Sequence, residues 1–398
     1  MPAASVGDQP ITALLSGPAA GVVGAIKAAE TLEMKDLITL DMGGTSTDVA
    51  IIQNGRPGMT AQLEIDGLPI RTPVVDIVTV GAGGGSISWI GPKSAGADPG
   101  PASFGRGGVD PTVTDANLVR GSLRAETLVV QGIKVDADAA LTSFDVLSSA
   151  LSLPREDMAD AVIRVAESNI VRAIQKISTE RGNDPRRFTL VAFGGAASLH
   201  AARVAEELNI QTVLVPVNAG VVSANGLLSS DYVHYTVATQ RLRLAQENLT
   251  EIRQIVDGLK AKARDHLTNE GVSGDPDFEV FLEMRYVGQA FEISVTLDDA
   301  DSALTTEAIG RAFAAEHHRI FEFAKPADAL ADIVSFRVGA RIAAQNIQPR
   351  SETGTDRAAP AQQSIELREK GQTLQCRVLR STDLGAEAQT GPMLIEDG

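Results

Sequence analysis

The sequence LITLDMGGTSTDVAII, residues 37–52, decides the fold. Its apolar ends, 37–40 and 49–52, predict two short buried strands, because brief apolar runs bounded by turn residues are typical of sheet cores. The segment between them, DMGGTSTD at 41–48, predicts a glycine loop with an aspartate at each end. Asn54-Gly55 predicts a hairpin turn after the second strand. The stretch therefore predicts strand, glycine loop, strand and turn.

This first loop has the residue types that bind a phosphate. Adjacent glycines let the backbone approach a ligand closely, and successive N–H groups can surround phosphate oxygens. Hard cations such as Mg²⁺ prefer oxygen ligands, so we expect Asp41 or Asp48 to hold Mg²⁺ through water, with Asp41 the preferred metal residue. The expected phosphate-binding residues are Gly43, Gly44, Thr45 and Thr47. A plain hairpin turn with acidic ends is the alternative.

A second glycine loop, GAGGGS at 81–86, follows an apolar run at 74–80. Consecutive glycines cost backbone entropy unless a loop needs their geometry. Gly83, Gly84 and Gly85 are therefore expected to contact phosphate or ribose, and the alternative is a tight connection between strands. The loop is neither a dinucleotide fingerprint, because no clear helix follows it, nor a P-loop, because it lacks Gly-Lys-Ser/Thr.

A third loop, FGGAASLHA at 193–201, joins an apolar strand at 189–193 to a helix. A helix N-terminus offers free N–H groups and partial positive charge, so Gly194 and Gly195 are candidate nucleotide contacts. His200, inside this helix, is predicted to be a packed or surface histidine rather than a ligand. Three such loops, each after an apolar strand, together predict a nucleotide held in a cleft between β-rich subdomains.

Composition excludes several classes of function. Of the 398 residues, 35 are basic and 51 acidic, and the resulting net charge of -16 repels nucleic acid and anionic membranes. No uncharged apolar run reaches the roughly 20 residues that span a bilayer. The single cysteine, Cys376, excludes an internal disulfide or thiolate cluster and fits a reducing compartment. We expect a cytoplasmic protein that binds neither nucleic acid nor membrane.

The pattern of apolar and polar residues changes near residue 235. Beyond it we expect a charged helix over 241–267, two antiparallel strands within 278–297 and an amphipathic helix over 304–323. The prediction is an α/β nucleotide-binding core at 1–235 followed by an α+β domain at 236–398.

Several motifs resemble those of the hydantoinase A/5-oxoprolinase family, which includes proteins like N-methylhydantoinase A and the acetone carboxylase beta subunit. The resemblance covers residues 14 to about 395, and its most diagnostic block lies at 94–119. The motifs are SGPAAGVVGA (16–25), DMGGTSTDV (41–49), VGAGGGSI (80–87), SAGADPGPASFGRGG (94–108), PTVTDANLV (111–119), FGGAASLHA (193–201), VVSANGLLSSD (221–231) and RYVGQAFEI (285–293).

The resemblance implies a partial nucleotide-binding domain of the actin, Hsp70 and sugar-kinase type, a ribonuclease H-like fold. It implies ATP and Mg²⁺ as cofactors, catalytic roles for Asp41 and Asp48, and opening of a cyclic amide such as a hydantoin or 5-oxoproline. The glycine loops correspond to a second phosphate loop (Asp41, Gly43, Gly44, Thr45, Asp48), a nucleotide-side loop (Gly83, Gly84, Gly85) and an adenosine-side loop (Gly194, Gly195). The implied partner is a B-type subunit within a homo- or hetero-oligomer.

The chain departs from the family pattern in three places. Family members carry an earlier N-terminal domain with its own D-x-G-G-T loop, and we expect this chain to lack it. Ala197-Ser198 stands where the family usually has Gly-Pro, and Ser103-Phe104 stands where it has Cys-Tyr. The missing loop leaves a truncated non-catalytic subunit as one alternative. A second is a subunit like that of acetone carboxylase, which phosphorylates a ketone or bicarbonate, because residue patterns alone do not separate it from a cyclic amide hydrolase.

Overall fold

The computed structural model describes residues 15–60, 63–65, 68–70, 74–88, 93–126, 135–297, 304–326, 329–343 and 363–396. These residues form two compact units. The larger unit contains the described residues between 15 and 229 together with 363–396, and the smaller unit contains those between 230 and 343.

The two units differ in extent from the two predicted domains. The chain passes into the smaller unit at Ser230, five residues before the expected boundary. Residues 363–396 contact the larger unit, whereas the sequence pattern assigned them to the second domain. The cause is a set of ion pairs between this segment and helices of the larger unit, which lie far apart along the chain. The domain ranges 1–235 and 236–398 stay a prediction.

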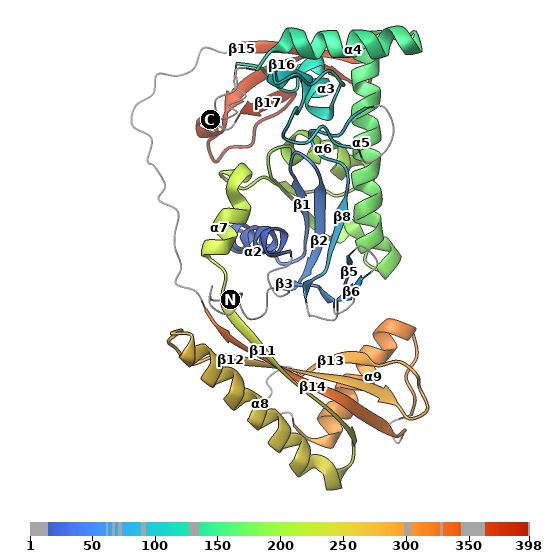
Figure 1. The fold of residues 1–398 in the computed structure, drawn as a ribbon, viewed down its shortest axis with the longest axis vertical. Helices are drawn as coiled ribbons and strands as arrows, with labels where there is room; N and C mark the ends of the chain where they lie inside the picture. The colour runs from blue at the N-terminus through green and yellow to red at the C-terminus, as the bar shows by residue number, and fades with distance from the viewer. Residues whose placement is uncertain are drawn as a thin grey trace. The chain divides into compact units, whose positions relative to one another are not determined.

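A mixed sheet forms the centre of the larger unit (Figure 1). Its strand order is β10-β9-β1-β2-β3, with β8 also paired to β2. β1 is parallel to β9, and β9 is parallel to β10, whereas β2 is antiparallel to β1, β3 and β8. The strands are β1 (Leu37–Met42), β2 (Thr47–Gln53), β3 (Arg56–Pro57), β8 (Ile77–Val80), β9 (Thr189–Phe193) and β10 (Val213–Leu214). The predicted α/β class and the strand-loop-strand pattern are confirmed.

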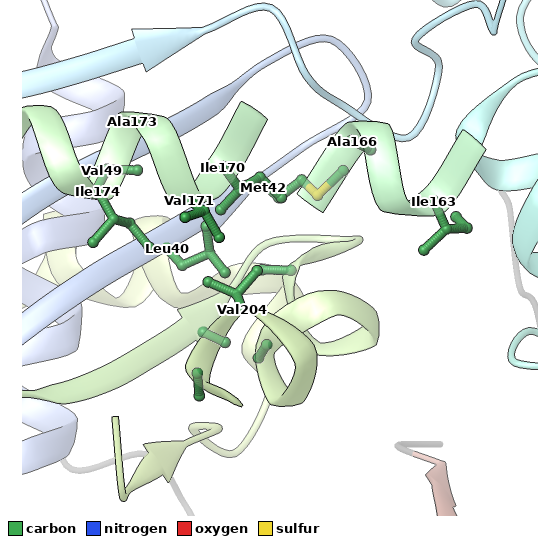
Figure 2. Packing of buried hydrophobic residues seen from close by; sticks show 14 of the residues in the cluster. Leu40, Met42, Val49, Ile163, Ala166, Ile170, Val171, Ala173, Ile174 and Val204 are labelled. Atoms are coloured by element: carbon green, nitrogen blue, oxygen red, sulfur yellow. The ribbon is translucent and has the colours of Figure 1, made fainter. Parts of the chain in front are cut away.

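Helices cover both faces of this sheet. On one face, Leu40 and Met42 pack with Ile170 of α5 and Val204 of α6 (Figure 2). On the other, Leu37 packs with residues of α2 and α7. The helices of the unit are α2 (Ser16–Glu30), α3 (Val113–Arg120), α4 (Ala137–Leu151), α5 (Arg155–Ile177), α6 (Ala197–Leu208) and α7 (Val222–Leu228). None of the helices in the described parts of the chain is long and apolar enough to cross a membrane.

α2 begins at Ser16, so Ser16-Gly17-Pro18 forms its first turn. A proline in the first helical turn loses no hydrogen bond, because the first N–H groups of a helix have no partner within it.

The other elements of the larger unit are small. Residues 363–396 form a three-stranded sheet of order β15-β16-β17. The remaining strands and 3₁₀ helices are β4 (Met59–Thr60), β5 (Leu63–Ile65), β6 (Leu68–Ile70), β7 (Val74–Val75), η2 (Ala102–Phe104), η3 (Thr179–Arg181), η4 (Pro185–Arg187), η5 (Ala219–Val221), β15 (Gln363–Glu369), β16 (Gln372–Arg380), η7 (Ser381–Asp383) and β17 (Met393–Glu396).

The smaller unit is an antiparallel sheet of order β11-β14-β12-β13 that packs with two helices. Its elements are β11 (Tyr232–Arg243), η6 (Gln246–Asn248), α8 (Leu249–Asn269), β12 (Asp277–Tyr286), β13 (Ile293–Leu297), α9 (Thr306–Phe321) and β14 (Ala331–Ile342). The two strands and the second helix were predicted. The helix predicted over 241–267 begins only at Leu249, because Arg241 and Arg243 continue β11 and bind Asp332 of β14.

Candidate functional site

The three glycine loops meet at one edge of the central sheet. β1 and β9 are parallel, with Asp41 opposite Phe193, so the loops that follow them start at the same edge. β8 ends at Val80, opposite Thr47, where the β1–β2 loop also lies. In open α/β sheets ligands bind at the carboxyl ends of parallel strands. The structure therefore brings together the three loops that the sequence singled out.

Asp41 and Asp48 face each other across the β1–β2 pair at this edge. Asp41 Oδ2 accepts a hydrogen bond from the Ser223 hydroxyl of α7 at 3.3 Å. Asp48 Oδ1 accepts one from the Thr79 hydroxyl of β8 at 2.5 Å. Each carboxylate is thus oriented by a hydroxyl from another element, as a site that depends on fixed geometry requires.

Burial raises the pKa of both carboxyl groups. For Asp41, burial and then the charge of Asp48 raise the pKa from 3.8 to about 6, against the opposing effect of the Ser223 hydrogen bond. For Asp48, burial raises the pKa, and the Thr79 hydrogen bond opposes the rise. A cation would be stabilised beside two partly buried carboxylates, of which Asp41 has a pKa raised further by the charge of Asp48.

The first glycine loop, between β1 and β2, is exposed and has free space beside its glycines. Gly43 N donates to Ser46 O at 3.1 Å, which closes the turn. Gly44 and Thr45 are exposed, and within the described residues their amides donate to no protein acceptor. A Cβ added at Gly43 or Gly44 would meet no atom within 4 Å. The arrangement leaves backbone N–H groups and empty space where a phosphate was expected.

The second loop supports the first. Gly83 N donates to Ser86 Oγ at 2.8 Å. The amides of Gly84 and Gly85 donate to the carbonyl oxygens of Gly43 and Gly44, at 3.0 and 2.6 Å. All three amides are therefore already paired with protein acceptors, and the expected contact of Gly83, Gly84 and Gly85 with nucleotide stays a prediction.

The glycines of this loop are needed for close packing. A Cβ at Gly83 would lie 2.6 Å from the backbone of Thr45, and one at Gly85 would lie 2.9 Å from Gly44 O. Thr47 is fully buried, and its hydroxyl donates to Ala82 O. Thr47 thus fixes the second loop to the first instead of presenting its hydroxyl to solvent.

The third loop adjoins Asp41. Gly194 has a φ of +86°, and a Cβ there would lie 2.5 Å from Asp41 Oδ1 and 2.6 Å from Met42 O. Ala196 N donates to Met42 O at 3.0 Å, which fixes the start of α6 to the end of β1. A Cβ at Gly195 would meet nothing within 4 Å, so this glycine borders open space. Ala197, at the departure from the family pattern, is fully buried.

Sequence reasoning missed the two hydroxyls that orient the carboxylates, Ser223 and Thr79. The usable signal for Ser223 was the small-residue pattern of α2. A Cβ at Gly21 would lie 2.9 Å from Ser223 Oγ, and a Cβ at Gly226 would lie 1.8 Å from Ala20 O. Such close approach requires glycine and holds α7 beside α2. No local pattern distinguished Thr79 within its strand.

Magnesium fits the donors at this edge. Mg²⁺ keeps several waters and needs only one or two protein carboxylates when a phosphate supplies other ligands. Asp41 and Asp48 could provide those carboxylates. No group of three His, Cys, Asp or Glu side chains suited to a metal occurs in the part of the chain that the structure describes. His200 lies elsewhere, fully buried, with Nδ1 3.3 Å from Glu167 Oε1.

Known proteins resemble this chain in both sequence and fold. The sequence model of the family described as Hydantoinase/oxoprolinase matches residues 1–236. Caprolactamase subunit alpha of Pseudomonas jessenii is 34% identical over 333 residues, which are 80% of this chain and 48% of that protein. A 5-oxoprolinase of Dictyostelium discoideum is 33% identical over 311 residues, which are 69% of this chain and 24% of that protein. The chain therefore spans less than half the length of these relatives.

Two solved structures have the same fold over 96% of this chain. The ATP-dependent caprolactamase from Pseudomonas jessenii matches with a TM-score of 0.81 and 31% identity, over 58% of its own chain. Nucleotide-free acetone carboxylase matches with a TM-score of 0.74 over 57% of its chain, and its 22% identity shows a shared fold alone. Both units of the present chain thus have counterparts within a single larger protein.

Proposed function

The chain belongs to the hydantoinase/oxoprolinase family, and we propose that it supplies one side of the ATP site of a cyclic amide hydrolase. The observation that carries the proposal is the open β1–β2 loop, where the amides of Gly44 and Thr45, which have no acceptor among the described residues, lie beside the Asp41–Asp48 pair. Phosphate oxygens would accept from these amides, and the carboxylates would hold Mg²⁺ through water. The name ATP-dependent caprolactamase, carried by a relative of the same fold, supports ATP as the nucleotide.

The proposed chemistry uses ATP to activate a ring amide. ATP, when bound, would transfer its γ-phosphoryl group to the ring carbonyl oxygen and leave as ADP. Water would then attack the activated ring carbon, the ring C–N bond would break, and inorganic phosphate would be released. Asp41 positions the cation, and the amides of Gly44 and Thr45 stabilise charge on the transferring phosphoryl group. Ser223 holds the Asp41 carboxylate in place. The substrate class is a cyclic amide of the lactam, hydantoin or 5-oxoproline type.

We also propose that the enzyme contains a second subunit. One relative is named as subunit alpha of caprolactamase, which supports assembly with a second, B-type subunit.

We place the reaction in the cytoplasm, on the ground that the sequence has one cysteine and no apolar run long enough to span a membrane. The 33–34% identity to amide-opening relatives favours this chemistry over ketone carboxylation.

Nucleotide binding by the chain itself tests the proposal. We expect calorimetry to detect MgADP binding, and Asp41→Asn to reduce the affinity at least tenfold. Asp257→Asn is the matched control, because Asp257 is an exposed carboxylate of α8 in the smaller unit. Equal MgADP affinity of Asp41→Asn and the parent chain would reject the site.

Turnover tests the substrate class separately. Phosphate release from Mg-ATP is measured with caprolactam, hydantoin, 5-oxoproline, or acetone plus bicarbonate, for the full-length protein with and without its partner subunit. Release that depends on a cyclic amide supports the proposed reaction. Release that depends only on acetone and bicarbonate supports the carboxylase alternative, and the lack of any release supports a non-catalytic role.

A further inference from the structure

A groove of about 700 Å³ lies in the larger unit. One side is the end of β8 and the second glycine loop, through Val80, Ala82 and Ser86, and the other side is α5, which lies beside β8 in Figure 1. A volume of this size accommodates a small organic molecule. Neither carboxylate of the phosphate site lines the groove.

The walls of the groove are apolar. Val80 and Ile87 contribute from the β8 side, and Met158 and Val162 contribute from α5. Val165 of α5 also lines it, although this residue is 63% exposed. Covering these surfaces with an apolar ligand body would remove them from water, which is favourable in proportion to the area covered.

One end of the α5 wall is cationic. Asn169, Arg172 and Lys176 succeed one another at helical spacing, so they share a face of α5. Arg172 donates to the side-chain oxygen of Asn169. Within the described residues neither cation has a carboxylate partner, and no Asp or Glu is among the residues that line the groove. Two cations with no carboxylate partner in the described part of the chain are notable, because the net charge of the chain is -16.

The hydroxyls of the opposite wall are already engaged. Ser86 Oγ accepts from Gly83 N, and Ser88 Oγ donates to Pro111 O. The groove therefore offers an apolar body and an anion-binding end, with few other free polar groups. From this combination we infer that the groove binds small carboxylates with an extended apolar part, as a ligand site separate from the nucleotide.

The carboxylate of such a ligand would pair with Arg172 and Lys176, and its hydrocarbon part would lie along Val162, Val165 and Val80. An alcohol of the same length would gain the apolar contacts and lose the ion pairs. A hydrophilic anion such as acetate would gain the ion pairs and lose the apolar contacts. The inferred site thus requires both parts in one molecule.

Calorimetric titration with octanoate and octan-1-ol tests the inference on the 398-residue chain. We expect octanoate to bind with at least tenfold higher affinity than octan-1-ol. The double variant Arg172→Gln/Lys176→Gln should lose at least tenfold affinity for octanoate and keep its affinity for octan-1-ol. Arg164→Gln is the matched control, because Arg164 is an exposed cation of the same helix that does not line the groove.

A second variant tests the position of the apolar part. Ala161 lines the groove and is not fully buried, so Ala161→Trp should fill the groove without disturbing the core and abolish octanoate binding. No octanoate binding at millimolar concentration would overturn the inference, as would binding that the double variant leaves unchanged. Competition between octanoate and MgADP would also overturn it, because the ligand would then occupy the nucleotide site.

Discussion

Asp41 is a carboxylate whose ionised form is disfavoured by the fold. Its pKa is about 6 in the folded chain and 3.8 in the reference state, so the folded chain binds the proton more tightly. Stability is therefore lost as the pH rises from about 4 to 6, and the loss is complete above pH 6. A residue that destabilises its own fold in this way is typical of functional sites.

Replacing this carboxylate should stabilise the chain without its cation. We expect Asp41→Asn to raise the free energy of unfolding at pH 8 by on the order of 1 kcal/mol, a value reduced for partial exposure to solvent. The gain should shrink as the pH falls through 6 toward 4. Urea unfolding in EDTA between pH 8 and pH 5 measures it, with Asp257→Asn as the control. A gain that does not depend on pH would contradict the shifted pKa.

Gly194 offers a second test at the same scale. Its positive φ and the 2.5 Å approach of a Cβ to Asp41 predict that Gly194→Ala lowers the stability by about 2–3 kcal/mol. Gly195→Ala, where a Cβ meets nothing within 4 Å, should change it by less than about 1 kcal/mol. Thermal unfolding compares the two variants. Equal effects would mean that the third loop differs from the one described.

At the scale of elements, the second glycine loop acts as a support for the first. Gly83→Ala places a Cβ 2.6 Å from the Thr45 backbone, so the 43–46 loop must move. We expect MgADP affinity to fall at least tenfold while far-ultraviolet circular dichroism stays unchanged. Gly58→Ala is the control, because a Cβ there makes only ordinary contacts at 3.7 Å or more. Unchanged MgADP affinity of Gly83→Ala would show that the support is not needed.

The elements near the site were predictable where local sequence determines them. Asp41 lies at the end of β1 and Gly43 in the loop that follows it. The sequence pattern at 37–52 was therefore sufficient to predict where both residues lie. Ser223 reaches Asp41 across 182 residues, and only tertiary packing of α7 on α2 brings it there. The charged stretch beginning at Arg241 looked helical, and pairing with β14 about ninety residues later made it a strand.

At the scale of the whole molecule, a buried ionic cluster joins the last sheet to the larger unit. Arg120 Nη2 lies 2.7 Å from Glu369 Oε2 of β15, and Arg203 Nε lies 3.0 Å from Glu369 Oε1. Asp160 and Glu167 of α5 pair with the same arginines. Glu369 is the member of this cluster that comes from the C-terminal sheet.

Removing that one carboxylate should loosen the sheet. We expect Glu369→Gln to lower the stability by roughly 1–2 kcal/mol, because Arg120 and Arg203 lose one carboxylate partner and keep Asp160 and Glu167. Limited proteolysis should cut within 363–396 faster than in the parent chain. Glu366→Gln, an exposed carboxylate of the same strand, is the control. Equal protease resistance of Glu369→Gln and Glu366→Gln would show that the ionic cluster does not hold the C-terminal sheet on the larger unit.

The distance between Arg120 and Glu369 along the chain, 249 residues, also bears on how the protein is made. During synthesis the arginines of α3 and α6 emerge long before their carboxylate partner, and the whole smaller unit is translated in between. Closing so long a loop is slow compared with forming local contacts. The larger unit should therefore complete its folding only after β15 leaves the ribosome, and chains released early should be targets for chaperones and proteases.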